Sequence, residues 1–515
     1  MKTPFLAGSY KSASSNVAND RCINLYPEFI ETKQGQEAGA LYRTPGMTLF
    51  SILSGNRLNM SGVYPIRAIC KIDDNRALAV CGALLWVLSP DLGASLIGYT
   101  GTSADSLDTL YGPVQVVTNG VSALIVDGVA AYVTDFNHII ARPLDALGVK
   151  PSVAAYQDKF AIVNQTQGFP QRWYQSNLND FTVFDSLNFS SKDSQPDPIV
   201  TMFDIHREVW LMGTEHTEVW INGGLPGFVF QRLQGVFIEA GCAAAQTPCR
   251  VGQGIMWLGR TNQGVGQVYL TDGGYVPRNV ATHAVSTAIN GYAKTSRIDD
   301  AFAYTYEDRG HIFYVITFPS ANATWCFDLA TGLWHERATW VNELGVLPSG
   351  FGLQYPLAEN AYNRSPVTCS CYFGGRILVG TEGGRLGYLD NDEITELGNP
   401  VRWQRTWRAL PSGQNNREPL RFNGLEIVME TGVNKALDPT TPYSMMLRWT
   451  DDGGHTYSNE RQMTIGRLGE TGLRVFTTRL GATDRRSGLD RVFELSGSDP
   501  FPPVLISAEL DAEPA

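Results

Sequence analysis

Residues 311–337 read HIFYVITFPSANATWCFDLATGLWHER, and this stretch sets the pattern for most of the chain. Its aromatic-rich runs Thr324–Asp328 and Leu333–Arg337 flank the sequence Ala330-Thr331-Gly332. A glycine at that place supplies the positive φ angle that a tight turn between two strands demands. The stretch therefore predicts a β-hairpin whose strands carry large aromatic side chains.

The same hairpin pattern recurs along the chain. Further aromatic or apolar runs and turn signals are Val209-Trp210-Leu211, Glu218-Val219-Trp220, Thr118-Asn119-Gly120 and Thr271-Asp272-Gly273-Gly274. Seven such units recur at intervals of about 40 to 65 residues, which fits propeller blades better than solenoid repeats. The units cover residues 76–88, 114–134, 159–174, 207–222, 254–275, 311–337 and 376–390. The sequence thus predicts an all-β fold with a β-propeller of six or seven blades over residues 66–398. We interpret the aromatic side chains as packing between blades, with a sugar-binding platform as the alternative.

The two ends of the chain depart from this pattern. Residues 1–65 include Pro45 and Gly46, and we expect an extended, irregular N-terminal segment that packs on or closes the propeller. Beyond residue 399, strand-like runs of a size typical of a β-sandwich follow one another. We therefore expect a C-terminal β-sandwich-like docking domain over residues 399–515. Helical spacing is nearly absent, and only residues 277–298 offer a place for a short helix.

Composition narrows the class of function. The 515 residues include 52 glycines and only 18% charged residues, which favours short strands over solvated helices. The net charge is −11, and no basic run exceeds a pair, so sequence-specific DNA binding is not expected. An acidic wall would instead repel a DNA duplex and let it slide.

The start of the chain and its apolar runs indicate in which compartment the protein folds. The N-terminus lacks the apolar core of a secretory signal, and the longest apolar stretch, 77–88, is too short to span a bilayer. We therefore expect folding in a reducing cytoplasm, where the eight cysteines stay thiols.

The sharpest local motif is Thr450-Asp451-Asp452-Gly453-Gly454-His455-Thr456-Tyr457. It resembles the Asp box of sialidases and related propellers, which is a structural turn distant from the active site. In such a turn, Asp452 can cap backbone N–H groups and Gly454 can adopt a positive φ angle. Tyr457 can anchor the turn in the core. We expect a structural turn formed by Thr450, Asp452, Gly454, Thr456 and Tyr457.

No motif points to catalysis or to a bound metal. The chain has no Gly-x-x-x-x-Gly-Lys-Ser/Thr loop, no Gly-x-Ser-x-Gly elbow and no His-Glu-x-x-His pair. A four-thiol zinc site from Cys242, Cys249, Cys369 and Cys371 is conceivable, but the spacing matches no standard zinc module. Buried thiols are the simpler interpretation. We expect no enzyme, no cofactor and no metal.

Ordered segments across nearly the whole chain resemble one known family. They are Ala13–Asn16, Asp20–Glu28, Arg43–Gly46, Trp173–Ser176, Gly213–Trp220, Ile238–Cys242, Thr324–Arg337, Leu447–Gly454 and Asp490–Phe493. Together they are similar to the tail hub, or nozzle, proteins of short-tailed phages, which are also called packaged-DNA stabilisation proteins.

The resemblance implies a ring of typically six copies below the portal and adaptor rings of the virion. Such a homo-hexamer closes the exit channel after packaging, holds the tail needle or plug, and docks fibres or spikes. Genomic DNA passes through its lumen without sequence-specific binding. The resemblance also implies a location in the virion tail, with assembly in the host cytoplasm, and it carries no catalytic residues over to this chain.

Two other classes of function stay open at this stage. The Asp-box motif and the many aromatic residues suit a glycan-active propeller, either a sialidase-like hydrolase or a lectin. A sialidase would need an arginine cluster, a tyrosine nucleophile and an acid/base carboxylate, and no spacing in the chain points to them. A receptor-binding fibre or spike is the other alternative, although neither β-helical repeats nor a stalk pattern is visible.

Overall fold

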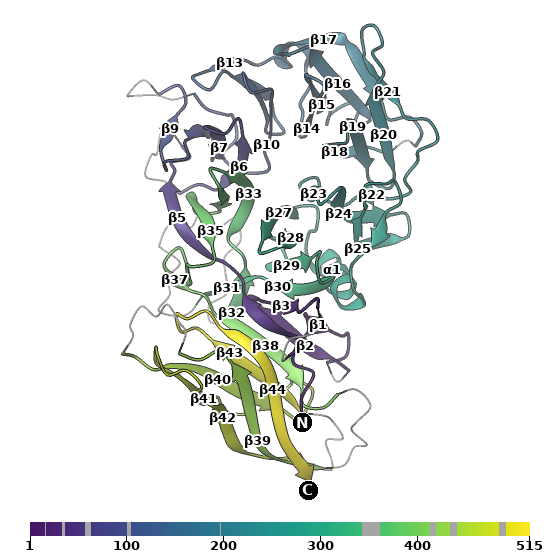
Figure 1. Ribbon diagram of the computed structural model, residues 1–515. Helices are drawn as coiled ribbons and strands as arrows, with labels where there is room; N and C mark the ends of the chain where they lie inside the picture. Colours follow the sequence, from purple (N-terminus) through teal and green to yellow (C-terminus); the bar gives the residue numbers. More distant parts are fainter. Residues whose placement is uncertain are drawn as a thin grey trace.

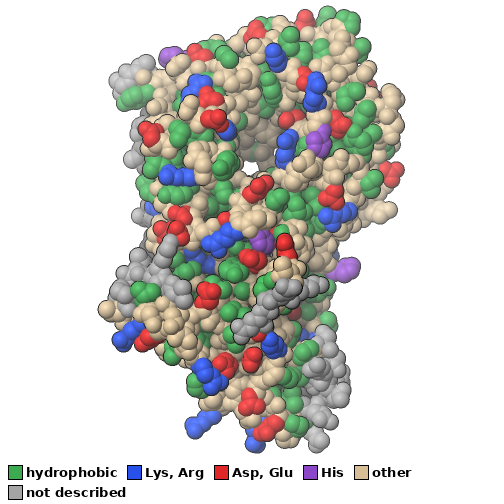
Figure 2. Space-filling view, in the orientation of Figure 1, with side chains coloured by type: hydrophobic (Ala, Val, Ile, Leu, Met, Phe, Trp, Pro, Cys, Tyr) green, Lys and Arg blue, Asp and Glu red, His purple; other side chains and the backbone are tan. Residues whose placement is uncertain are grey.

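The computed structural model describes residues 1–15, 17–32, 37–56, 63–99, 105–195, 197–341, 361–411, 419–432, 440–483 and 491–515. Most of the described chain is β-strand, and seven sheet units form a ring to which a two-sheet sandwich is joined at the rim (Figure 1). Figure 2 shows an opening in the middle of the ring. The expected all-β class, with a propeller followed by a sandwich, is confirmed.

The first four blades are four-stranded antiparallel sheets whose strands follow one another along the chain. Blade 1 contains β6 (Ile66–Lys71), β7 (Ala77–Cys81), β8 (Leu84–Leu88) and β9 (Ala94–Leu96). Blade 2 contains β10 (Gln115–Thr118), β11 (Ala123–Val126), β12 (Ala131–Thr134) and β13 (Ile139–Ala141). Blade 3 contains β14 (Ala154–Gln157), β15 (Phe160–Asn164), β16 (Arg172–Asn177) and β17 (Asp180–Ser191). Blade 4 contains β18 (Ile199–Ile205), β19 (Glu208–Gly213), β20 (Thr217–Asn222) and β21 (Phe230–Arg232).

The remaining blades vary this plan. Blade 5 contains β22 (Gly241–Cys242), β23 (Cys249–Val251), β24 (Gly254–Thr261), β25 (Gly264–Leu270) and β26 (Arg278–Asn279), with both β22 and β23 paired to β24. Blade 6 contains β27 (Phe302–Asp308), β28 (His311–Phe318), β29 (Ala323–Asp328) and β30 (Leu333–Glu336). Blade 7 contains β33 (Val367–Phe373), β34 (Arg376–Thr381) and β35 (Arg385–Asp390) and takes its fourth strand, β5 (Gly46–Ile52), from the N-terminal segment.

Aromatic side chains fill the spaces between blades. Trp173 of blade 3 is fully buried, and its ring lies 5.2 Å from that of Trp220 in blade 4. At the next boundary the rings of Trp210 and Trp257 are 6.5 Å apart. Edge-to-face pairs of this kind add to the apolar area that neighbouring sheets bury.

The ring closes between blade 7 and blade 1. β5 runs antiparallel to β35, and Leu53, just after β5, is buried with Ile66 of blade 1 against Phe373 and Leu386 of blade 7. The N-terminal segment therefore joins the last blade to the first.

Residues 1–65 are more regular than the sequence suggests. They form β1 (Tyr10–Lys11), β2 (Asn19–Ile23), β3 (Leu25–Phe29), β4 (Gly39–Arg43) and β5. β2 and β4 pair with strands several hundred residues later, so their partners leave no local pattern to read. The expectation of irregular chain was wrong, because these residues form strands that belong to three different sheets. As part of this segment, β5 lies in blade 7 at the closure of the propeller.

The sandwich consists of two sheets. One contains β38 (Trp403–Arg408), β43 (Val492–Gly497), β40 (Tyr443–Thr450) and β41 (Arg461–Gly466). The other contains β3, β4, β44 (Val504–Pro514), β39 (Leu420–Met429) and β42 (Val475–Ala482). Buried side chains from both sheets form the core, among them Trp407, Leu425, Phe493 and Leu505.

Short elements complete the described structure. They are the antiparallel strand pairs β31 (Ala338–Val341) with β32 (Ala361–Arg364) and β36 (Thr395–Glu396) with β37 (Asn399–Pro400), a short 3-10 helix at Asp145–Leu147, and the helix α1 (His283–Thr295). α1 lies within the stretch 277–298, and its buried side chains Val285 and Ile289 pack between blades 5 and 6. None of the helices in the described part of the chain has both the length and the apolar character needed to cross a membrane.

Candidate functional site at the joint between propeller and sandwich

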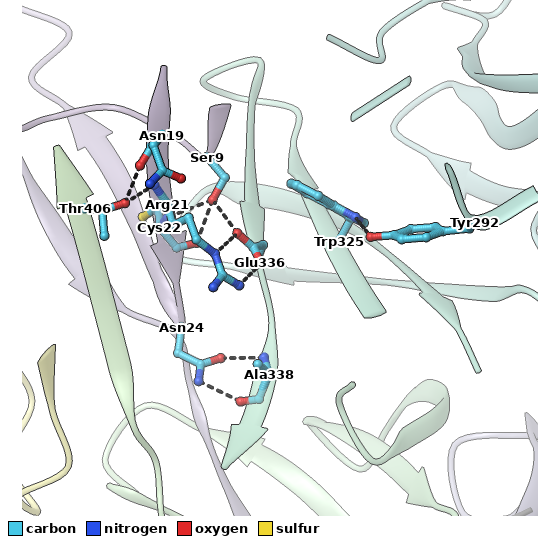
Figure 3. Close-up of polar contacts among 10 residues, drawn as sticks. All are labelled: Ser9, Asn19, Arg21, Cys22, Asn24, Tyr292, Trp325, Glu336, Ala338 and Thr406. Atoms are coloured by element: carbon cyan, nitrogen blue, oxygen red, sulfur yellow. Dashed lines mark hydrogen bonds and ion pairs between the residues drawn. The ribbon is translucent and has the colours of Figure 1, made fainter. Parts of the chain in front are cut away.

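The strand β2 joins the propeller to the sandwich. It pairs in parallel with β30 at Ile23 and Glu336, and antiparallel with β38 from Arg21–Ile23 to Gln404–Thr406 (Figure 3). Blade 6 and one sheet of the sandwich thus form a single ten-stranded sheet. We refer to β2 and the side chains around it as the joint.

An ion pair crosses the joint beside β2. Arg21 donates from Nε to Glu336 Oε1 at 3.0 Å and from a terminal nitrogen to Oε2 at 2.5 Å, so the contact is bidentate. Burial opposes the charge of Arg21, but the Glu336 carboxylate outweighs it and raises the pKa of the guanidinium. Ser9 also donates to Glu336 Oε1, at 3.2 Å, and accepts from the Cys22 amide at 2.7 Å.

Asn24 ties three backbone segments together. Its Oδ1 accepts from the amide of Ala338 at 3.0 Å, and its Nδ2 donates to the carbonyls of Ala338 at 2.7 Å and Arg402 at 2.8 Å. The backbone of Asn24 has φ of 55°, a left-handed conformation that asparagine tolerates better than most residues. The side chain therefore links the end of β2 to β31, which follows blade 6 in the chain, and to the residue before β38.

Arg405 is the most deeply buried charge of the joint. Its side chain is fully buried and donates to three carbonyls: Phe5 at 2.8 Å, Gly8 at 3.2 Å and Arg21 at 3.3 Å. Burial lowers the pKa of this guanidinium. Because carbonyl oxygens of the N-terminal segment are its partners, Arg405 holds that segment against β38.

Further charged and aromatic residues surround the joint. The Arg402 guanidinium lies 4.1 Å from the centre of the Trp340 ring and 5.9 Å from that of Tyr362, which is cation–π geometry. Glu494 accepts from Arg448 Nε at 2.7 Å. Burial raises the pKa of Glu494 despite the neighbouring arginines.

The structure brings the Asp-box residues together in a turn between β40 and β41. Asp452 Oδ1 accepts from Thr450 Oγ1 at 2.7 Å and from the amide of Thr456 at 2.9 Å, while Oδ2 accepts from Thr456 Oγ1 at 2.5 Å. These hydrogen bonds lower the pKa of Asp452, and the two from the threonine hydroxyls have the largest effect. Gly454 has φ of 98°.

Tyr457 does not lie where the sequence suggested. It is half-buried, with the Arg448 guanidinium 4.4 Å from the centre of its ring, and so stands at the joint and not in the sandwich core. A Cβ at Gly454 would lie 2.7 Å from Asn19 Nδ2, so the turn presses directly against β2. The Asp-box turn is therefore part of the joint.

The cysteines are dispersed. All eight lie in described segments as free thiols, with Cys242 and Cys249 in blade 5 and Cys369 and Cys371 in blade 7. The conceivable four-thiol site is thus not assembled. Burial raises the pKa of Cys242 to about 11 and of Cys369 to about 12. Across the described residues, no group of three or more His, Cys, Asp or Glu side chains is placed to hold a metal.

A small cavity lies between blades 4 and 5. It has a volume of about 30 Å³ and is lined by Trp210 and Tyr275, among others. Glu208 accepts from the Tyr275 hydroxyl at 2.5 Å and from Trp210 Nε1 at 3.2 Å. A space of this size accommodates water and not a sugar ring.

Sequence reasoning missed the joint itself. Arg21, Asn24, Glu336 and Arg402 come from distant parts of the chain, and no spacing links them. The signals were that segments 20–28, with Arg21 and Asn24, and 324–337, with Glu336, were among those that resemble the phage proteins. Asn16 and Asp490, which also belong to the resembling segments, lie outside the described residues.

Solved structures resemble the chain only loosely. The designed Ika8 protein is 10% identical, with 67% of this chain and 99% of that chain covered and a TM-score of 0.39. PorZ of Porphyromonas gingivalis is 9% identical, with coverages of 73% and 44% and a TM-score of 0.37. BamB from Moraxella catarrhalis is 11% identical, with coverages of 67% and 97% and a TM-score of 0.34. With TM-scores below 0.5, these likenesses identify neither a relative nor a function.

Family models give a definite assignment. Among curated proteins no sequence is similar enough to count as a match. The family model described as the β-propeller of bacteriophage P22 Gp10 matches residues 1–394, and the model described as its β-sandwich matches residues 402–513. Both descriptions agree with the architecture of the chain, which therefore belongs to the bacteriophage P22 Gp10 family and is a structural protein of the phage tail that stabilises packaged DNA.

Proposed function

We propose that six copies of this chain form a ring in the tail of a short-tailed phage, where the ring extends the channel below the portal and adaptor and keeps the packaged genome inside. The observation that carries the proposal is the match of both family models, in order, to nearly the whole chain. The joint supports it, because a subunit that bears pressure from packaged DNA needs its two parts firmly connected.

The partners follow from the same role. The ring would bind the adaptor protein on its upper side, hold the needle or plug, and dock fibres or spikes, with the sandwich as a docking domain. Assembly would take place in the host cytoplasm. The net charge of −11 suits a wall along which DNA passes without sequence-specific binding.

The role requires no catalysis, and we propose that the chain is not an enzyme. The Asp-box turn, which first suggested a sialidase-like protein, would serve as a structural contact at the joint. Its side chains bond to one another, Gly454 packs against Asn19 of β2, and the half-buried Tyr457 contacts Arg448.

The decisive experiment uses particles made without this protein. We expect filled heads that lose their genome, measured as DNA that becomes sensitive to nuclease, and recovery of protection when the purified chain is added back. Native mass spectrometry of the chain with and without the adaptor ring should give a six-copy assembly in at least one condition. Heads that retain DNA normally without the protein, or a strict monomer in both conditions, would contradict the proposal.

A further inference from the structure

We propose that the propeller and the sandwich of each subunit move as one rigid body, so that the tail channel opens by rotation of whole subunits and not by bending at the joint. The part of this proposal that concerns the channel rests on the proposed function. The part that concerns rigidity rests on the contacts of a single chain.

The first support is the continuous sheet. A hinge between two domains needs a few residues that are free to change φ and ψ. Here β2 is paired on both sides, with β30 of blade 6 at Ile23 and with β38 of the sandwich along Arg21–Ile23. Bending at this place would break strand pairing on one side of β2.

The second support is the number of backbone connections. Residues 43–46 lead from β4 in the sandwich to β5 in blade 7, and residues 391–402 lead from β35 in blade 7 to β38. Arg43 donates to the Glu393 carbonyl, which bonds the two connections to each other. The Leu397 amide donates to the Met47 carbonyl at 2.9 Å, which bonds the second connection to β5. Together with β2 they fix the sandwich at three places and oppose rotation about any one of them.

The third support is the cost of opening the joint. Arg21 of β2 makes a bidentate, partly buried ion pair with Glu336 of β30 in blade 6. Pulling β2 away from blade 6 would leave the Glu336 carboxylate partly buried without its partner, which costs more than losing an exposed ion pair. The same movement would break the hydrogen bonds between Asn24 and Ala338.

Single-molecule fluorescence transfer tests the proposal on the full chain. Fluorophores are placed through non-natural amino acids, which spares the native thiols, at Val276 in the propeller and Gln462 in the sandwich. Val276 is 86% exposed, and Gln462 is also exposed. We expect one narrow population of transfer efficiency in the isolated chain, and the same value in assembled tails before and after DNA release.

Two populations in the isolated chain, or a shift on DNA release, would overturn the proposal. The double variant Arg21→Gln with Asn24→Ala should broaden the distribution or add a second population. Arg142→Gln, which removes exposed ion pairs of blade 2, should not. If the double variant gives a distribution of transfer efficiency as narrow as that of the wild type, these side chains do not hold the joint rigid. If the chain forms no ring, the proposed function fails, but the isolated chain still decides the question of rigidity.

Discussion

At the scale of single residues, the joint depends on side chains that satisfy backbone groups far away in sequence. Asn24 combines a left-handed backbone with hydrogen bonds to Ala338 and Arg402. The Asn24→Ala variant loses these bonds and keeps the strained φ, and we expect it to lower the free energy of unfolding by about 2–4 kcal/mol. Denaturant titration measures the change. Asn119→Ala, in a turn of blade 2, is the control and should lower the free energy of unfolding by clearly less.

Gly454 permits the contact between the Asp-box turn and β2. Its φ is 98°, and a Cβ would lie 2.7 Å from Asn19 Nδ2. The matched control is Gly469, with φ of 88° and no atom within 4 Å of its added Cβ. Both alanine variants meet the same backbone strain, but only Gly454→Ala adds a clash, so we expect it to be less stable by at least about 1 kcal/mol. Equal thermal midpoints for the two variants would contradict the contact.

Asp452 gives the Asp-box turn a dependence on pH. Its hydrogen bonds hold its pKa below the ordinary value of 3.8 in the folded state. A lowered folded-state pKa contributes stability that is present above 3.8 and is lost as the pH falls below it. We therefore expect wild type to be more stable than Asp452→Asn at neutral pH, with a difference that shrinks in acid. Unfolding midpoints of both proteins between pH 7 and pH 3 test this, and a difference that grows in acid would refute it.

At the scale of elements, β5 closes the propeller. The Leu397 amide donates to the Met47 carbonyl on the side of β5 that faces away from β35. Backbone groups alternate in direction along a strand, so the N–H and carbonyl of the next residue, Thr48, face β35. Thr48→Pro removes this N–H donor, and we expect faster hydrogen exchange in β35 and at the boundary with β6. Thr48→Val keeps the pairing and is the control. Exchange that stays as slow as in wild type would mean that blade 7 does not need its fourth strand.

Local chemistry decides which elements can be read from sequence. The hairpin at Ala330-Thr331-Gly332 was visible because glycine marks its turn. The turns Asp158-Lys159 and His206-Arg207 also have positive φ at both residues, but no glycine or asparagine marks them. The Asp-box turn was found because its hydrogen bonds span only a few residues. The joint was not, because its pairing depends on contacts between distant segments, which no local pattern encodes.

At the scale of the whole molecule, the two family models do not correspond to two independent folding units. The N-terminal segment supplies β3 and β4 to the sandwich and β5 to the propeller, and its first residues bond to β44, with the Thr3 amide on the Ala508 carbonyl at 3.0 Å. Neither part can complete its sheets before residues from both ends of the chain have met. We infer that propeller and sandwich fold as one cooperative unit.

The sandwich offers the sharpest test of this inference. Phe5, Leu25 and Leu41 are buried in its core, and each contributes about 1.5–3 kcal/mol through burial, so their loss rivals the 5–15 kcal/mol that stabilises a typical domain. We therefore expect residues 399–515 alone to lack fixed tertiary structure by near-UV circular dichroism. A peptide of residues 1–45 should restore the signal, whereas the same peptide with Leu25→Asp and Leu41→Asp should not, because it keeps the strands but cannot fill the core. A fragment that folds without the peptide would show that the sandwich folds on its own and does not need the N-terminal strands for its stability.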